Sequence, residues 1–97
     1  MNSLSSPLST KPRSLGELLR ARREDVGLSQ GGLAELLKDV RGVTQGKISY
    51  WERDVYHPDP GQLGELGQHI FRDGDIDLAV ALARLHPPTG LSAASAA

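Results

Sequence analysis

The stretch from Ser29 to Glu52 constrains the fold more than any other part of this 97-residue chain, because it reads as two short helices joined by a turn. Each helix is preceded by a hydroxyl residue, Ser29 or Thr44, whose side-chain oxygen can accept a hydrogen bond from a free N–H group of the first turn. Gly42 lies between them and can adopt the positive φ that a sharp exit from a helix requires. The stretch therefore predicts a tight pair of helices.

Each helix of the pair carries one narrow apolar stripe, and the two stripes must face a common core. In the first helix Leu33, Leu36 and Leu37 fall at i, i+3 and i+4, and in the second Ile48 and Trp51 are three residues apart. The other side of the second helix is polar or small: Gln45, Gly46, Lys47, Ser49 and Tyr50. A helix with such a face can enter the major groove of DNA.

One helix is predicted before the pair. Ser14 is its N-cap, and Glu17, three residues later, completes a capping box in which each side chain binds the other residue's free N–H. Leu15, Leu18 and Leu19 form its buried stripe. The charged residues that follow are expected to form mainly a solvent-exposed face.

Two further helices are predicted after the pair. One has Asp59 as its N-cap and Pro60 at the first helical position, and the other is capped by Asp75 or Asp77. The last helix is apolar nearly all round, so we expect one face to pack on the core and the other on a second subunit. The residues expected at this homodimer interface are Ile76, Leu78, Leu82 and Leu85.

The two ends of the chain differ in composition from the middle. Residues 1–13 are rich in Ser and Pro, and residues 87–97 begin with two prolines and end in an Ala/Ser run, so both are predicted to be disordered tails. The remaining residues, 14–86, are predicted to form one all-α domain of five helices, including the C-terminal dimerisation helix.

Composition excludes several classes of protein. The chain has no cysteine, hence no disulfide framework and no thiolate zinc site, which fits a reducing cytoplasm. It has no apolar run long enough to span a bilayer and no N-terminus of the signal type, so no membrane partner is expected. Because the three histidines, His57, His69 and His86, are scattered, we expect no enzyme activity, no metal site and no cofactor.

The net charge of −1 does not by itself point to nucleic acid. The basic residues nevertheless lie mainly in the first half: from Met1 to His57 there are nine Lys/Arg against seven Asp/Glu, and from Pro58 to Ala97 two against five. This small excess predicts only modest non-specific affinity for DNA through counterion release.

From Leu15 to Ile70 the sequence resembles the helix-turn-helix domain of the Cro and phage-repressor type. The features that match, in the order and spacing of that family, are Arg23, Gly27-Leu28-Ser29-Gln30, Leu33-Ala34, the segment Thr44 to Ser49 with Ile48, Glu52 and Pro58. The resemblance implies a lambda-repressor-like fold and a cytoplasmic regulator encoded by a bacterium, plasmid or phage, expected to act as a repressor on double-stranded DNA.

The resemblance also implies roles for particular residues. The helix from Thr44 to Glu52 would lie in the major groove, with Arg23 and Glu52 forming a partly buried, bidentate ion pair. The residues expected to contact bases are Gln45, Gly46, Ser49 and Tyr50. The residues expected to contact the DNA backbone are Gln30, Lys38, Arg41, Thr44, Lys47, Arg53, Tyr56 and His57.

The sequence departs from the family pattern at two places. Between Leu33 and Thr44 it has about four residues more than the family, close to one helical turn, so either the second helix is longer by a turn or the connection is an enlarged loop. Asp54 stands where the family usually has a glycine in the left-handed conformation, which Asp tolerates better than most residues.

A second function remains open from the sequence. The weak basicity and the apolar last helix also suit a protein-binding adaptor on the same fold, such as an antitoxin-like partner.

Overall fold

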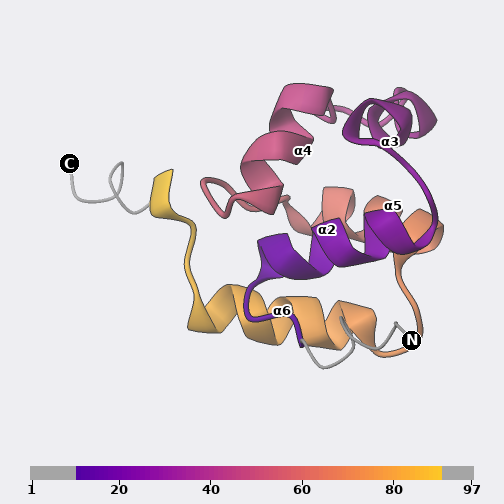
Figure 1. Ribbon diagram of the computed structural model, residues 1–97. Helices are drawn as coiled ribbons and strands as arrows, with labels where there is room; N and C mark the ends of the chain where they lie inside the picture. The colour runs from indigo at the N-terminus through magenta and orange to yellow at the C-terminus, as the bar shows by residue number, and fades with distance from the viewer. Residues whose placement is uncertain (1–10, 91–97) are drawn as a thin grey trace, which may run out of the picture.

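Five helices pack around one core in the computed structural model, which describes residues 11–90 (Figure 1). They are α2 (Leu15–Asp25), α3 (Gln30–Leu36), α4 (Gln45–Glu52), α5 (Pro60–Ile70) and α6 (Asp75–Leu85). Figure 1 shows α3 and α4 together on one side of α2, and α6 on its other side. No strand occurs in the described part of the chain, so the predicted five-helix, all-α architecture is confirmed. None of these helices is long and apolar enough to cross a membrane.

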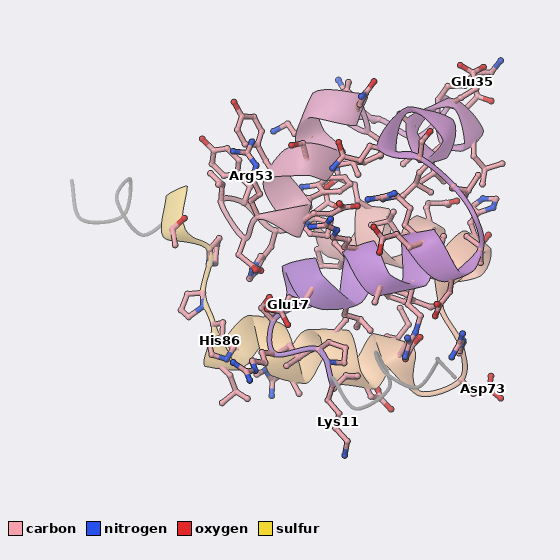
Figure 2. All side chains as sticks on the ribbon, in the orientation of Figure 1. Lys11, Glu17, Glu35, Arg53, Asp73 and His86 are labelled. Atoms are coloured by element: carbon pink, nitrogen blue, oxygen red, sulfur yellow. The ribbon has the colours of Figure 1, made fainter. Side chains whose placement is uncertain are left out.

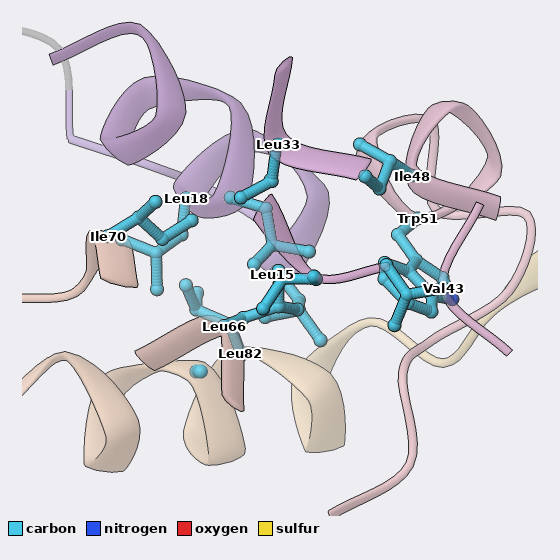
Figure 3. Close-up of a cluster of buried hydrophobic side chains, with 12 residues drawn as sticks. Leu15, Leu18, Leu33, Val43, Ile48, Trp51, Leu66, Ile70 and Leu82 are labelled. Carbon is cyan, nitrogen blue, oxygen red and sulfur yellow. The ribbon is translucent and has the colours of Figure 1, made fainter. Parts of the chain in front are cut away.

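All five helices contribute to the core, where Trp51 is the largest side chain (Figure 3). Leu33 and Leu37 are both buried, as their spacing predicts. Leu36, assigned to the same stripe, is 48% exposed, and that assignment is wrong. The reason is that α3 ends at Leu36. Of the two adjacent leucines at this helix end, only Leu37 reaches the core.

Hydrogen-bonded caps fix the beginnings of the first four helices. The hydroxyl groups of Ser14, Ser29 and Thr44 each accept a bond from the backbone N–H three residues later, as predicted. Asp59 forms a complete capping box with Gln62. Because these caps set where each helix starts, they also set which side of it faces the core.

Two predicted caps are wrong in detail. Glu17 accepts its bond from the N–H of Arg13, so the capping box with Ser14 is not reciprocal. The last helix has no side-chain cap: it follows Gly74, whose φ is +86°, and Asp75 is already its first residue. The Asp75 side chain instead accepts hydrogen bonds from Arg22 and from the N–H of Arg72.

The connection between α3 and α4 is an enlarged loop, residues 37–44, and not an extra helical turn. Gly42 has a φ of +81°, which gives the turn its direction. Buried Val43 and the bond from Gln62 Nε2 to the Arg41 carbonyl (3.1 Å) fasten the loop to the core and to α5. The additional residues therefore leave the start of α4 firmly held.

The ordered part of the domain passes the predicted boundary at residue 86. Thr89 donates its N–H to the carbonyl of Asp54 (2.9 Å), and Gly90 donates to the carbonyl of Val55 (2.7 Å). Residues 87–90, assigned to the C-terminal tail, therefore pack against the domain. Most of the N-terminal tail and the rest of the C-terminal one, residues 1–10 and 91–97, lie outside the described residues.

Candidate functional site

The outer side of α4 is the most accessible polar helix face that the sequence singles out. Ile48 and Trp51 are each 2% exposed and anchor the inner side of the helix in the core. Of the residues expected to contact bases, Gln45, Gly46 and Tyr50 are exposed, and Ser49 is half-buried. One face of α4 thus holds the fold, while the other is solvent-exposed in the structure of residues 11–90.

A buried ion pair fixes α4 against α2. Arg23 donates from Nε to Glu52 Oε2 (2.6 Å) and from Nη2 to Oε1 (2.9 Å), the bidentate geometry that the family resemblance implies. Its Nη1 also donates to the Leu28 carbonyl (2.7 Å). The side chain of Arg23 is 9% exposed and that of Glu52 is 5% exposed. Hydrogen bonding to Glu52 raises the pKa of Arg23 above its ordinary value.

Gln30 joins this pair from the start of α3. Its Nε2 donates to Glu52 Oε1 (3.0 Å), so the amide expected at the DNA backbone is engaged inside the protein. Glu52 consequently receives hydrogen bonds from both α2 and α3. The orientation of α4 relative to both helices is therefore set by one carboxylate.

Four side chains at the end of α4 form one cluster, which we call the tyrosine–cation cluster: Lys47, Tyr50, Arg53 and Tyr56. The rings of Tyr50 and Tyr56 meet edge to face, with centroids 5.5 Å apart. Lys47 Nζ lies 5.3 Å from the centre of the Tyr56 ring, and Arg53 Cζ lies 5.1 Å from the centre of the Tyr50 ring. Two cations and two phenol groups are thus displayed together on the surface.

The sequence indicated each member of this cluster separately but did not show that they touch. Successive members of Lys47, Tyr50 and Arg53 are three residues apart, and this spacing predicts that they lie on one side of the helix. Tyr56 joins them only because the loop after α4 folds back. No periodicity predicts that turn.

The loop after α4 is held by Asp54, whose φ is +60° in place of the usual glycine. Its carboxylate accepts hydrogen bonds from Ser14 Oγ (2.6 Å) and from the N–H of Gly16 (2.9 Å), so it binds the first turn of α2. His57 Nε2 lies 3.5 Å from the same carboxylate, and its side chain is only 12% exposed. The prediction that His57 contacts the DNA backbone is therefore wrong, because its ring is turned inward.

The remaining predicted backbone contacts do not all lie together. Lys38 is exposed but pairs with Glu35 (3.4 Å), and Figure 2 shows Glu35 and Arg53 at opposite ends of the surface that α3 and α4 form. Arg41 is exposed in the loop before α4, and Thr44 is exposed at the helix start, where its hydroxyl serves as the cap.

On α6, the structure divides the residues predicted to form a dimer interface. Leu82 is 7% exposed and belongs to the core, so its assignment to the interface is wrong. Ile76, Leu78 and Leu85 are exposed, Leu85 by as much as 70%. Ile76 and Leu78 are two residues apart and point to different sides of the helix, while Leu85, seven residues after Leu78, shares its side.

The ion pair between Arg22 and Asp75 was not predicted. Arg22, expected on the solvent face, donates from Nε to Asp75 Oδ2 (2.6 Å) and from Nη2 to Oδ1 (3.2 Å). Asp75 also accepts from the N–H of Arg72 (2.8 Å). The hydrogen bond from Arg22 is the main reason why the pKa of Asp75 lies below its ordinary value, and the bond from Arg72 acts in the same direction.

Residues 14–75 match a family model described as a helix-turn-helix domain, which covers α2 to α5 and reaches the first residue of α6. Neither the search of curated proteins nor the search of solved structures gives a significant match. Within residues 11–90, no three His, Asp or Glu side chains gather as a group that could hold a metal ion.

Proposed function

The chain belongs to the helix-turn-helix domain family, which matches it over more than half of its length, and from this we infer that it is a sequence-specific DNA-binding transcriptional regulator acting as a repressor. In this proposal α4 is the recognition helix and lies in the major groove of double-stranded DNA. The Cro and phage-repressor subtype and the cytoplasmic location are part of the same proposal.

The observation that carries the proposal is the distribution of charge around α4. Its one acidic residue, Glu52, is turned inward to Arg23, and Asp54 just after it is bound to the start of α2. The outer side therefore presents Lys47 and Arg53 without a carboxylate partner among the ion pairs of the described residues. A chain of net charge −1 can in this way display a locally cationic surface to a phosphate backbone.

The roles follow from the chemistry of the exposed groups. Gln45, at the start of α4, can make the bidentate contact that an amide forms with adenine N6 and N7. Lys47 and Arg53 are suited to phosphates of the DNA backbone, and the Tyr50 ring to a base edge or a thymine methyl group. Gly46 allows close approach, since a Cβ there would meet only the Thr44 hydroxyl, at 3.9 Å.

We also propose that the regulator is a homodimer through the side of α6 that carries the exposed residues Leu78 and Leu85. Two recognition helices related by a two-fold axis would then read half-sites about one helical turn apart. The alternative, a protein-binding adaptor or antitoxin-like partner, is favoured by the same exposed apolar side chains.

Selection of randomised duplex DNA by the purified chain, followed by titration of the selected duplex over a range of salt concentrations, tests the proposal. We expect a selected consensus sequence and a linear fall of log affinity with log salt concentration. A scrambled duplex of the same composition is the control and should bind more weakly. If neither duplex binds below micromolar concentrations, the adaptor is the better account.

A further inference from the structure

After α6 the chain returns to the end of α4. Thr89 donates its N–H (2.9 Å) and its hydroxyl (3.3 Å) to the carbonyl of Asp54, and Gly90 donates its N–H to the carbonyl of Val55 (2.7 Å). We call residues 87–90 the C-terminal strap. Figure 1 shows its yellow end beside the loop that follows α4. The strap thus satisfies two successive carbonyl groups of that loop.

The strap also touches Tyr56 directly. A Cβ placed on Gly90 would lie 2.6 Å from the Val55 carbonyl oxygen and 3.0 Å from Cε1 of the Tyr56 ring. Only a residue without a side chain fits here unless the loop shifts, because the first of these neighbours is backbone. The backbone of Gly90 is therefore one wall of the site in which the Tyr56 ring sits.

The other contacts of the Tyr56 ring belong to the tyrosine–cation cluster. The ring meets Tyr50 edge to face at 5.5 Å, and Lys47 Nζ lies 5.3 Å from its centre. Tyr56 is the side chain of the cluster among the three atoms nearest to a Cβ at Gly90, and its ring links the strap to Lys47. A displacement of the strap would therefore move the Tyr56 ring and change its contact with Lys47.

The strap is well placed to hold a fixed position without supporting the fold. Pro87 and Pro88 have restricted φ angles, so they limit the conformations of the segment between α6 and Thr89. None of the strap residues belongs to the hydrophobic core. Loss of the strap contact should therefore change the surface of the domain and leave its packing intact.

From these contacts we propose that the C-terminal strap positions Tyr56, and through it Lys47, so that the segment after α6 sets how firmly α4 holds DNA. This inference rests on the proposed function. Tyr56 and Gly90 act as positioning residues: an ordered ring keeps the ammonium group of Lys47 near one place on the surface. The value of a cation–ring contact at an exposed site corresponds to a change in affinity of about two- to fivefold.

The test compares Gly90→Ala with Gly64→Ala in the full chain, since a Cβ at Gly64 would meet nothing within 4 Å. We expect Gly90→Ala to weaken binding of the selected duplex about two- to fivefold and to shift the ring NMR signals of Tyr56 in the free protein. Gly64→Ala should do neither. Thr89→Pro, which removes the N–H donated to Asp54, is a second variant with the same expected result.

A double-mutant cycle with Tyr56→Ala decides the route. If the strap acts through the ring, Gly90→Ala has no further effect on affinity once Tyr56 is alanine. An equal loss in both backgrounds, or unmoved Tyr56 signals in a chain that binds DNA normally, overturns the inference and leaves the proposed function standing. If the wild-type chain binds no DNA, the proposed function and the effect on affinity both fail, while the shift of the ring signals still reports whether the strap positions Tyr56.

Discussion

Arg22 and Asp75 hold α6 against α2 through two parallel hydrogen bonds, although 53 residues separate them in the chain. The Asp75 side chain is 7% exposed and that of Arg22 is 18% exposed, so water screens this pair only weakly. Because Asp75 also accepts from the N–H of Arg72, the same carboxylate closes the turn before α6. The pair therefore joins the last helix to the rest of the domain.

Asp75→Ala should lower the free energy of unfolding by about 3 kcal/mol, because it strands the guanidinium group of Arg22 in a partly buried place. Urea denaturation followed by circular dichroism measures the change. Asp77→Ala is the matched control, since Asp77 lies in the same helical turn but is exposed, and it should change stability by less than about 0.5 kcal/mol. Equal effects of the two substitutions would contradict the role given to the pair.

The same pair predicts how stability depends on pH. The hydrogen bonds from Arg22 lower the pKa of Asp75 from its ordinary value of 3.8 in the folded protein. The stabilisation is therefore complete above the unfolded-state pKa and is lost as the pH falls toward the folded-state value. We expect the difference in stability between wild type and Asp75→Ala to be constant from about pH 7 to 5 and to narrow below about pH 4. A difference that stays constant down to pH 2 would argue against this ion pair as its source.

Gly16→Ala should destabilise the domain by about 1–3 kcal/mol, because α2 and α4 approach too closely there to admit a side chain. A Cβ at Gly16 would lie 2.5 Å from the carbonyl oxygen of Glu52 and 2.7 Å from that of Trp51. Gly64→Ala, on the open side of α5, should instead raise stability by about 0.5–1 kcal/mol. Thermal unfolding of the two variants gives opposite shifts of Tm if the helices are placed as described.

Gln45→Ala and Lys47→Ala should affect DNA binding differently. The first should cost about 1–3 kcal/mol on the selected duplex and relax the preference at one base pair. The second should weaken binding to all duplexes alike and reduce the slope of log affinity against log salt by about one. Gel-shift titrations on selected and scrambled duplexes separate the two patterns. Parallel losses on both duplexes for both variants would refute the assignment of Gln45 to a base.

Leu85→Glu should convert the proposed dimer into a monomer without unfolding it, because Leu85 is 70% exposed in the single chain. Sedimentation equilibrium measures the mass, and Val26→Glu is the control, since Val26 is also an exposed apolar residue (49%) but lies at the end of α2. A wild-type chain that sediments as a monomer would remove the dimer from the proposal.

Local patterns in the sequence predicted most of the fold. The hydroxyl and carboxylate caps at Ser14, Ser29, Thr44 and Asp59 define helix starts because a cap is a contact over three residues. Apolar spacing correctly predicted that Leu33 and Leu37 are buried. It wrongly predicted that Leu36 is buried, because spacing does not show where a helix ends.

What the sequence could not predict depends on residues far apart in the chain. The Arg22–Asp75 pair and the bonds of Asp54 to Ser14 and Gly16 exist only after α2, α4 and α6 have packed. The same holds for the inward turn of His57. For the candidate site, helical spacing gave the exposed side of α4, while the way in which Tyr56 folds back onto Lys47 needed the structure.

Trp51 and Tyr50 lie on opposite sides of α4, and Tyr56 lies in the loop that follows the helix. Trp51, the one tryptophan of the chain, is sealed in the interior, whereas both tyrosines lie on the outside. Indole fluorescence should consequently report whether the helix stays seated, and phenol emission should report what touches its outer surface. An unlabelled sample can then distinguish occupancy from denaturation, since a ligand on the surface should alter the phenol signal first and unfolding should alter both.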